Sequence, residues 1–400
     1  MQLVTRKSAI IALAATAGLV LAACGSSSSS SPTAAAVKVP AFTISSFTRD
    51  FTAMTELKAL TAKGKGNVAA ILPDTVTSAR YTEFDAPYLT EALSLAGLSP
   101  TQFSVQNAQG SDATELSLAQ EAITKGASVL IMDPLDSTVG ASIESYAKAH
   151  GVPVIDYDRL TLGGSRKYYV SFNNIQVGKL IGNGFVACAT AWHVAKPNVL
   201  VMRGDPTDNN ATLFAQGYDG VLAPHFSSGA YVNVGTPPGT WTPSVALTEF
   251  QQQFTAHKNI NSVLVPNDEN AAPIIHYLQS LHIKPRTFPV TGQDATLVGL
   301  QNILAGYQCG TAYKPIYLEA QAAVALAIIL RAHETPPASL VNKSVTDTVS
   351  HTQVPSVLMT PTWVTPANMN ATVIADQFVP PQQLCVGPYV APCTAAGIKV

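Results

Sequence analysis

Hydrophobic and polar positions alternate along most of the chain in blocks of two lengths. From Asn67 onward, short runs of β-branched or apolar residues are followed by longer amphipathic segments, such as ELSLAQEAITKG and SIESYAKAHG, that end on a glycine suited to a helix C-terminal cap. A short apolar strand followed by a helix is the repeating unit of a parallel sheet covered by helices. The pattern therefore predicts an α/β fold made of stacked βαβ units.

Strand-like runs recur too often for a single comfortable sheet. They are NVAAIL (67–72), TQFSVQ (101–106), ASVLIMD (127–133), PVIDYD (153–158), KYYVSF (167–172), NVLVMR (198–203), YVNVG (231–235), SVLVPN (262–267), FPVTGQ (288–293) and GTAYK (310–314). We expect two doubly wound parallel-sheet lobes, the first holding residues 66–172. No Pro/Ser-rich linker interrupts the pattern there, so the lobes are expected to share a close hinge.

The N-terminus is typical of an exported protein. Arg6 and Lys7 precede an apolar stretch, residues 8–23, that is too short for a normal membrane span, so residues 1–23 are interpreted as a signal peptide. Its end, Leu-Ala-Ala-Cys, resembles a lipobox, which makes Cys24 the candidate lipidation site. The Ser/Ala-rich segment 24–40 is expected to be a flexible tether. An ordinary cleaved signal with an incidental cysteine is the alternative.

Export favours disulfides among the remaining four cysteines. Cys385 and Cys393 lie close together in the tail 383–400 and are a possible disulfide, whereas Cys188 and Cys309 are free or paired. The sequence alone allows three pairings. None of the cysteines has the spacing of a metal site, so neither a metal nor a cofactor is expected.

Composition points to a packed protein with a small partner. The chain is 47% hydrophobic and 12% charged, with a net charge of −2 and no basic block. These values exclude a disordered chain and argue against a surface that binds nucleic acid.

Polar side chains follow nearly every predicted strand. The candidates are Asp74, Arg80, Tyr81, Asp133, Asp158, Arg159, Asn173, Asn174, Asp205 to Asn210, Asn267, Asp268, Gln293, Asp294 and Lys314. Because ligands of parallel α/β sheets bind beyond the carboxyl ends of the strands, these side chains predict a binding crevice. Helix capping is the alternative for Asn173, Asp208, Asn209 and Asp268, but capping needs neither the guanidinium of Arg159 nor the ammonium of Lys314.

This mixture of residues suits a neutral polyhydroxylated ligand. Carboxylates, amides, Arg and Lys can pair with sugar hydroxyls, and aromatic faces such as Tyr81 and Trp241 can cover the apolar side of a sugar ring. Burial in the hydrophobic core is the alternative for Trp241, although its setting, GTWTPS, is typical of a loop. No nucleophile elbow, zinc-binding HExxH, P-loop or dinucleotide fingerprint occurs, and no catalytic residue is assigned. A glycosidase needs an acid with a raised pKa, and we expect Arg159 and Lys314 to keep neighbouring acids ionised.

Several blocks together resemble the type I periplasmic sugar-binding proteins of bacterial ABC importers, in the family's order. They are VIDYDRL, YYVSFNNIQVG, GDPTDNNATLF, PNDENA, TGQDATLVGLQNILAGYQCGTAYKPI and VPSVLMTP, within a resemblance that runs from about 67 to about 378. The resemblance implies two lobes joined by a three-crossing hinge and closing on one sugar, with residues 66–172 and 312–345 in lobe 1 and residues 173–311 and 346–382 in lobe 2.

The resemblance also implies the ligand contacts. They fall on Arg80, Asp158, Arg159, Asn210, Trp241, Asn267, Asp294 and Lys314, largely the residues that the strand ends selected. Asn210 is expected to offer its amide to a sugar hydroxyl, Asp208 and Asn209 to shape the loop and cap the following helix, and Asp205 to form a turn. Tyr81 stands where the family's xylose-binding members carry Trp, which leaves the sugar open. The extension 41–65 and the tail 383–400 lie outside the resemblance.

The expected function is capture of a monosaccharide, D-xylose first among the pentoses, by a lipid-anchored monomer in the cell envelope that serves an ABC permease and its ATPase. A lipoprotein that reports a sugar to a membrane receptor, or the same fold binding another pentose or hexose, remains an alternative. A sugar-processing enzyme is not expected.

Overall fold

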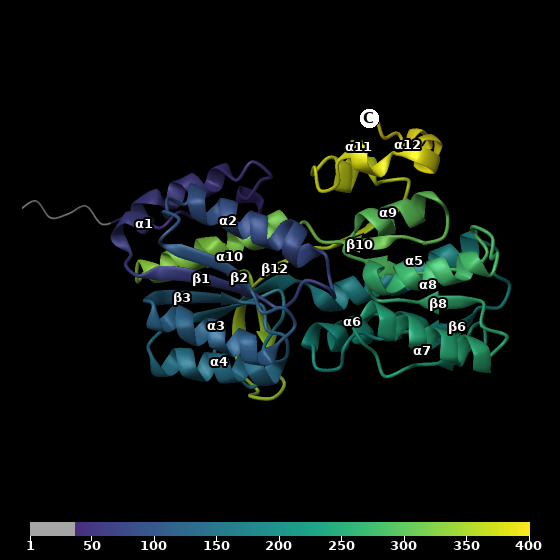
Figure 1. The fold of residues 1–400 in the computed structure, drawn as a ribbon, viewed down its shortest axis with the longest axis horizontal. Coiled ribbons are helices and arrows are strands. Elements are labelled where there is room, and N and C mark those ends of the chain that lie inside the picture. Colours follow the sequence, from purple (N-terminus) through teal and green to yellow (C-terminus); the bar gives the residue numbers. More distant parts are fainter. Residues whose placement is uncertain (1–36) are drawn as a thin grey trace, which may run out of the picture. The chain divides into compact units, whose positions relative to one another are not determined.

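The computed structural model of the protein describes residues 37–400. The expected signal peptide, Cys24 and most of the tether lie outside the described residues. Within 37–400, no helix is both long enough and apolar enough to cross a bilayer. This part of the chain forms two α/β lobes (Figure 1), as the alternating pattern predicted.

The first lobe contains a seven-stranded sheet with the order β11-β12-β5-β4-β3-β1-β2. Its strands are β1 (Asn67–Leu72), β2 (Phe103–Asn107), β3 (Ala127–Met132), β4 (Val154–Tyr157), β5 (Tyr168–Phe172), β11 (Lys343–Thr346) and β12 (Gln353–Met359). Neighbours pair in parallel except β11, which is antiparallel to β12. The interior strand β1 is buried on both faces, which explains its continuous apolar run.

Helices cover both faces of this sheet (Figure 1). They are α3 (Asp112–Thr124) and α4 (Ser137–Ala149) on one face, and α2 (Ala86–Leu95) and α10 (Ile316–Arg331) on the other. The segment AQAAVALAIIL makes α10 apolar all round, so it needs a cover on its outer side as well.

The N-terminal extension supplies part of that cover. It contains η1 (Ile44–Ser46), η2 (Thr52–Leu57) and α1 (Lys58–Lys63), and it packs the buried side chains of Phe51, Met54 and Leu57 into the same core as α10. The side chain of Gln321 in α10 also donates to the carbonyl oxygen of Thr48 at 2.9 Å. The extension therefore completes the core of the first lobe.

The second lobe contains two three-stranded ladders, β7-β6-β8 and β13-β10-β9, connected by a parallel bridge between Val263 and Val290. Its strands are β6 (Asn198–Val201), β7 (Val232–Gly235), β8 (Ser262–Leu264), β9 (Gly292–Gln293), β10 (Thr311–Tyr313) and β13 (Thr362–Val364). Its main helices are α5 (Asn174–Ala191), α6 (Asn209–Ser227), α7 (Pro243–Ala256), α8 (Asp268–Ser280) and α9 (Leu297–Leu304). Helices α5 and α6 touch closely, because a Cβ on Gly178 would lie only 2.0 Å from the carbonyl oxygen of Phe214.

The chain passes between the lobes at three points: at Asn173 after β5, at Lys314 and Pro315 after β10, and at residues 360–361 after β12. The expected segment boundaries differ from this path. Residues 346–359, expected in lobe 2, belong mainly to the sheet of lobe 1, because β12 pairs in parallel with β5. Strand β10, expected mostly in lobe 1, pairs with β9 and β13 in lobe 2.

Two disulfides stabilise the second lobe and the tail. Cys188 in α5 is bonded to Cys309 before β10, and Cys385 is bonded to Cys393. After η4 (Asn370–Ile374), the tail forms α11 (Pro381–Leu384), η5 (Gly387–Tyr389) and α12 (Val390–Ala395), and it packs beside α9 (Figure 1). The tail therefore extends the core around α9 through buried Leu384, Cys393 and Ile398.

Candidate functional site

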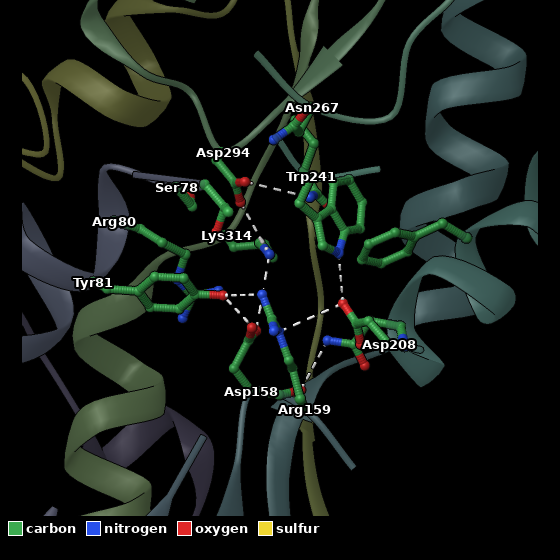
Figure 2. Close-up of a pocket in the computed structure, with 14 residues that line it drawn as sticks. Ser78, Arg80, Tyr81, Asp158, Arg159, Asp208, Trp241, Asn267, Asp294 and Lys314 are labelled. Carbon is green, nitrogen blue, oxygen red and sulfur yellow. Dashed lines mark hydrogen bonds and ion pairs between the residues drawn. The ribbon is translucent and has the colours of Figure 1, made fainter. Parts of the chain in front are cut away.

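The strand ends of the two lobes surround one cavity of about 330 Å³ (Figure 2). It is lined by Thr77, Ser78, Arg80, Tyr81, Asp158, Arg159, Asp208, Asn210, Phe214, Trp241, Asn267, Gln293, Asp294 and Lys314. The structure thus brings together all nine side chains that the sequence nominated for ligand binding. The lining side chains of the two lobes lie close together, which favours a small ligand.

Arg80 is the most heavily paired side chain of the cavity. It follows the loop after β1 and precedes the π-helical segment η3 (Tyr81–Asp85). Its Nε and Nη2 donate to the two carboxylate oxygens of Asp85 at 2.9 and 2.8 Å, Nη2 also donates to Glu319 at 2.7 Å, and Nη1 donates to Asp158 at 2.7 Å. Four of its five N–H groups are therefore used, and one on Nη1 remains for a ligand.

Asp158 occupies a strained backbone position at the end of β4. Its φ is +55°, in the left-handed region, and the Arg159 N–H donates to the Tyr157 carbonyl oxygen at 2.6 Å across a tight turn. The Asp158 carbonyl oxygen accepts hydrogen bonds from Tyr169, Ser171 and Asn210. These bonds hold the turn so that the Asp158 side chain lines the cavity.

The charge of Asp158 is stabilised by its neighbours. Burial by itself raises the pKa of a carboxyl group, but Arg80, Lys314 and Arg159 outweigh burial, and the pKa of Asp158 lies below its ordinary value. Burial likewise lowers the pKa of an amine, but Asp294 and Asp158 outweigh it and raise the pKa of Lys314. Both groups therefore remain charged at neutral pH.

Arg159 is held on several sides. Its Nη2 donates to the Tyr81 hydroxyl at 3.0 Å and its Nη1 to the Leu135 carbonyl oxygen at 3.1 Å. Its Nε lies 3.5 Å from Asp208 and 3.7 Å from Asp133. The guanidinium also lies over the Tyr81 ring, 5.7 Å from its centroid. Tyr81 and Arg159 therefore form one rigid wall of the cavity.

Trp241 forms part of the opposite wall together with Phe214. The two rings meet edge to face with centroids 6.4 Å apart, and Trp241 is 8% exposed. Gly204 allows this placement, since a Cβ there would lie 2.2 Å from the indole. Trp241 is thus packed in the core on one side and lines the cavity on the other, which combines the two alternatives that the sequence left open.

Asp208 does more than the capping role expected from the sequence. Its Oδ1 accepts from the Asn210 N–H at 2.8 Å at the start of α6, as a helix cap does. Its Oδ2 accepts from Trp241 Nε1 at 3.0 Å and faces Arg159. The prediction that Asp208 shapes the loop and caps the helix is therefore correct as far as it goes but omits these two contacts. Asp205 forms the expected turn by accepting from the Thr207 N–H at 2.9 Å.

Asn210 differs from its expected role. Its Nδ2 donates to the Asp158 carbonyl oxygen at 3.0 Å, and its Oδ1 accepts from Asn174 at 2.7 Å and from the Tyr169 hydroxyl at 3.3 Å. Asn210 therefore joins the lobes directly, and only the second N–H of its amide remains for a ligand.

Thr77, Ser78, Phe214 and Gln293 also line the cavity, although the sequence did not nominate them as ligand contacts. Gln293 carried a signal, because it stands directly before Asp294 at a predicted strand end. Phe214 lies in the second turn of α6, and its apolar side chain looked like an ordinary core position. Thr77 and Ser78 belong to a loop whose course depends on its partner in the other lobe.

The fixed charges around the cavity are balanced. Arg80, Arg159 and Lys314 face Asp158, Asp208 and Asp294, three cations to three carboxylates. A balanced set suits a neutral ligand with many hydroxyl groups, which can pair with both signs.

Of the three acids Asp133, Asp158 and Asp208, Asp158 alone has a lowered pKa, the direction in which the neighbouring cations were expected to act. Burial raises the pKa of Asp208 despite Arg159, and burial together with the charge of Asp158 raises the pKa of Asp133 well above its ordinary value. Neighbouring cations therefore do not prevent an acid near the cavity from having a raised pKa.

Similarity to known proteins decides the family. Residues 69–335 match the periplasmic binding protein domain family. The chain is 35% identical over 277 residues to the D-xylose-binding periplasmic protein of Escherichia coli K12, which covers 68% of this chain and 80% of that protein. This chain is a type I periplasmic sugar-binding protein.

Other members of the periplasmic sugar-binding proteins support the fold. The multiple sugar-binding periplasmic receptor of Rhizobium radiobacter is 29% identical over 342 residues, covering 81% of this chain and 93% of that protein. A solute-binding protein of Chloroflexus aurantiacus in complex with D-glucose superposes with a TM-score of 0.71 at 26% identity, over 79% of this chain and 97% of that one. The relatives are named as binding proteins and receptors, so the expectation of a non-enzymatic sugar-binding protein of an ABC importer is confirmed.

Proposed function

We propose that this protein captures an aldopentose, D-xylose, between its two lobes and delivers it to a membrane permease and its ATPase. The observation that carries the proposal is the balanced set of buried charges, held in place by their own partners, around a cavity of about 330 Å³. A sugar in this cavity meets side chains of both lobes, so it stabilises the closed arrangement. A permease can distinguish that arrangement from the open one.

Discrimination between sugars comes from their hydroxyl groups. Hydrogen bonds to charged partners contribute about 1.5–3 kcal/mol each, and a sugar that lacks one hydroxyl leaves a buried charge without its partner. Asp158, Asp294 and Lys314 are all at most 5% exposed, so such a loss has little compensation from water. The walls formed by Tyr81 and by Trp241 with Phe214 suit the apolar side of a pyranose ring.

D-xylose is supported by the relative from Escherichia coli, which is named for that sugar, and by the nine nominated residues around the cavity. Other relatives are named for several sugars or for ribose. The loop PDTVTSARY, which ends with Arg80 and Tyr81, is the segment in which we expect a different specificity to originate.

A thermal-shift screen of the mature protein tests the proposal. The sugars are D-xylose, L-arabinose, D-ribose, D-glucose, D-galactose and myo-inositol, and a ligand that binds only the folded state raises the Tm. D-xylose is expected to give the largest shift, to be followed by calorimetry. A larger Tm shift with another sugar would contradict D-xylose as the ligand but would be compatible with a role in sugar transport. No Tm shift with any of the six compounds would contradict the proposal as a whole.

A sensor for a membrane receptor is the second candidate, favoured by the similarity to the Rhizobium radiobacter receptor over 93% of that protein. Both candidates predict sugar binding, so a functional readout separates them. In vesicles that contain the permease and its ATPase, the sugar-loaded protein is expected to stimulate ATP hydrolysis and sugar uptake. Normal uptake in cells that lack this protein would favour the sensor.

We further propose that the protein is attached to the membrane surface through a lipid on Cys24. The motif Leu-Ala-Ala-Cys and the Ser-rich segment after it support this attachment. Cell fractionation tests it: the wild-type protein is expected with the membranes and the Cys24→Ser variant in the soluble extract. Equal distribution of both proteins would contradict lipid attachment.

A further inference from the structure

Direct hydrogen bonds join the lobes at two separate places around the cavity. One place is Asn210, which bonds the Asp158 carbonyl oxygen and the Tyr169 hydroxyl of lobe 1. It lies beside the hinge, because its other partner, Asn174, is the residue that follows the first crossing. These bonds are close to the pivot and need not break when the lobes separate.

The second place involves Glu269 in the first turn of α8. Its Oε1 accepts from the Ser78 hydroxyl and from the Ala79 N–H, both at 3.0 Å, across the boundary between the lobes. Its Oε2 accepts from the side chain of Asn267 at 3.1 Å. One carboxylate thus connects a lining residue of lobe 2 with the loop of lobe 1 that leads into Arg80 and Tyr81.

The Glu269 contact joins two segments that are not crossings, α8 in lobe 2 and the loop after β1 in lobe 1. Glu269 is not among the residues that line the cavity, although its partners Ser78 and Asn267 are. Figure 2 shows Ser78 and Asn267 toward one end of the lining and Asp158 toward the other. A contact between segments that do not carry the chain across is lost when the lobes separate, whereas Asn210 is bonded to the residue that follows a crossing. The Glu269 bonds therefore depend on closure more strongly than the Asn210 bonds do.

We propose that Glu269 is a closure latch, a positioning residue that holds the loop of Ser78 and Ala79 only when the lobes are together. The latch sets part of the ligand affinity without contact between Glu269 and the ligand. The latch proposal rests on the proposed function in one respect, that the ligand is a sugar. The latch orders the loop that carries Arg80 and Tyr81, so these side chains are in place when the sugar is enclosed.

A latch of this kind affects dissociation more than association. The sugar enters while the lobes are open and the latch is unmade, whereas its release requires opening and therefore rupture of the latch. Removal of the carboxylate leaves the Ala79 N–H and the Ser78 hydroxyl without their acceptor in the closed state. The closed state then becomes less populated, and the apparent affinity falls with that population.

The test compares Glu269→Ala, Glu269→Gln, Ser78→Ala and the Glu269→Ala/Ser78→Ala double variant with the wild type. Calorimetry with D-xylose gives the affinity, and stopped-flow tryptophan fluorescence, to which Trp241 in the cavity lining contributes, gives the rates. We expect Glu269→Ala to weaken binding about tenfold, mainly through faster dissociation. Glu269→Gln retains an acceptor oxygen and is expected to recover most of the affinity. Ser78 also lines the cavity, so the coupling in the double-mutant cycle, rather than the single variant, reports the latch.

Glu83→Ala is the matched control, since Glu83 is an exposed carboxylate of η3 in lobe 1, close in sequence to the loop that Glu269 contacts, with no ion pair among the described residues. Dissociation from Glu269→Ala as slow as from Glu83→Ala would overturn the latch. The latch would also be overturned if the affinity of Glu269→Ala fell through slower association. It would likewise be overturned if the changes in binding free energy of Glu269→Ala and Ser78→Ala were fully additive.

Hydrogen exchange of the Ala79 amide, measured with and without D-xylose, separates failure of the latch from failure of the proposed function. The sugar closes the lobes, so it is expected to slow this exchange in the wild type and in Glu83→Ala, and to slow it much less in Glu269→Ala. If D-xylose neither binds the wild type nor slows its exchange, the proposed function fails. Equal protection of Ala79 by the sugar in Glu269→Ala and in the wild type would overturn the latch and leave the proposed function standing.

Discussion

Lys314 Nζ lies 2.9 Å from Oδ1 of Asp294, and both side chains are almost completely buried. The pair arises because β9 and β10 are parallel neighbours, so the residues that follow them meet at the same edge of the sheet. Lys314 also stands at a crossing between the lobes and lies 3.9 Å from Asp158. One ammonium group therefore connects carboxylates from the two lobes in the cavity lining.

Loss of Asp294 is expected to weaken sugar binding without unfolding the protein. In Asp294→Ala, Lys314 loses its nearest counter-charge and the sugar loses an acceptor, so we expect the affinity to fall at least about tenfold. Calorimetry gives the affinity, and the circular dichroism melt checks the fold.

Asp219→Ala is the control for that variant, because the ion pair of Asp219 with Arg203 is partly exposed and lies outside the cavity. Equal affinity of Asp294→Ala and the wild type would remove Asp294 from the site.

Arg80 is expected to be essential for stability as well as for binding. Arg80→Met removes the ion-pair partner of the buried Asp85 and Glu319, and breaking a buried ion pair from one side costs about 3–5 kcal/mol. Urea unfolding followed by circular dichroism measures the loss. The Arg80→Met/Glu319→Gln variant also removes one of the unpaired carboxylates, so it is expected to regain part of the lost free energy of unfolding. A loss below about 1 kcal/mol in Arg80→Met would contradict the paired arrangement.

Sugar affinity is expected to fall as the pH rises through the neutral range. Burial, with the charges of Asp294 and Asp268, raises the pKa of Glu269 to about 8 in the closed arrangement. In the open arrangement water reaches this carboxyl, and its pKa returns toward the ordinary value of 4.5. A group with a raised pKa in the closed state binds its proton more tightly there, so protonation favours closure.

The advantage is fully present below about pH 4.5 and is lost as the pH approaches about 8. Calorimetry between these limits is expected to show a decline of about tenfold or more in the wild type. The decline should be absent in Glu269→Gln, which cannot titrate. Parallel pH profiles of the two proteins would show that another group is responsible.

The disulfide between Cys188 and Cys309 is expected to stabilise the fold without affecting the site. It joins positions 121 residues apart, and closing a long loop restricts the unfolded chain by a model-dependent amount of about 2–5 kcal/mol. The Cys188→Ala/Cys309→Ala variant should lose that much free energy of unfolding and keep its sugar affinity, because neither residue lines the cavity.

The Cys385→Ala/Cys393→Ala variant serves for comparison. Its loop spans only 8 residues, so about half the loss is expected on the same model. A larger loss there would show that the tail stabilises α9 through packing rather than through the closed loop.

Most strands of the two sheets could be predicted because they carry a strong local signal. Buried strands such as β1 and β3 appear as continuous apolar runs in the sequence. The helices between such strands end at glycines, so the limits of each βαβ unit can be recognised. Strands β11, β12 and β13 were not predicted. Strand β11 is mostly exposed at a sheet edge, and β12 contains Pro355, a residue that argues against a strand, so neither stands out from a loop.

The path of the last crossing could not be predicted for the same reason. Without β12 as a strand, no local feature places residues 346–359 beside β5 in the first lobe. The covering role of residues 41–65 could not be predicted either, because it depends on contact with the outer face of α10. One such contact, between Gln321 and Thr48, joins residues that are 273 positions apart in the sequence.

By itself, the sequence determined which chemical groups reach the cavity. Its apolar runs locate the strands, and in parallel α/β sheets the residues that follow the carboxyl ends of the strands, here Arg80, Asp158, Asp294 and Lys314, meet at one edge of each sheet. The tertiary structure decided what each group does there. Arg80 uses most of its N–H groups in hydrogen bonds to Asp85 and Glu319. Asn210 forms hydrogen bonds across the lobes, and Asp208 accepts a hydrogen bond from Trp241. These roles depend on pairings between distant segments, which local composition and spacing do not encode.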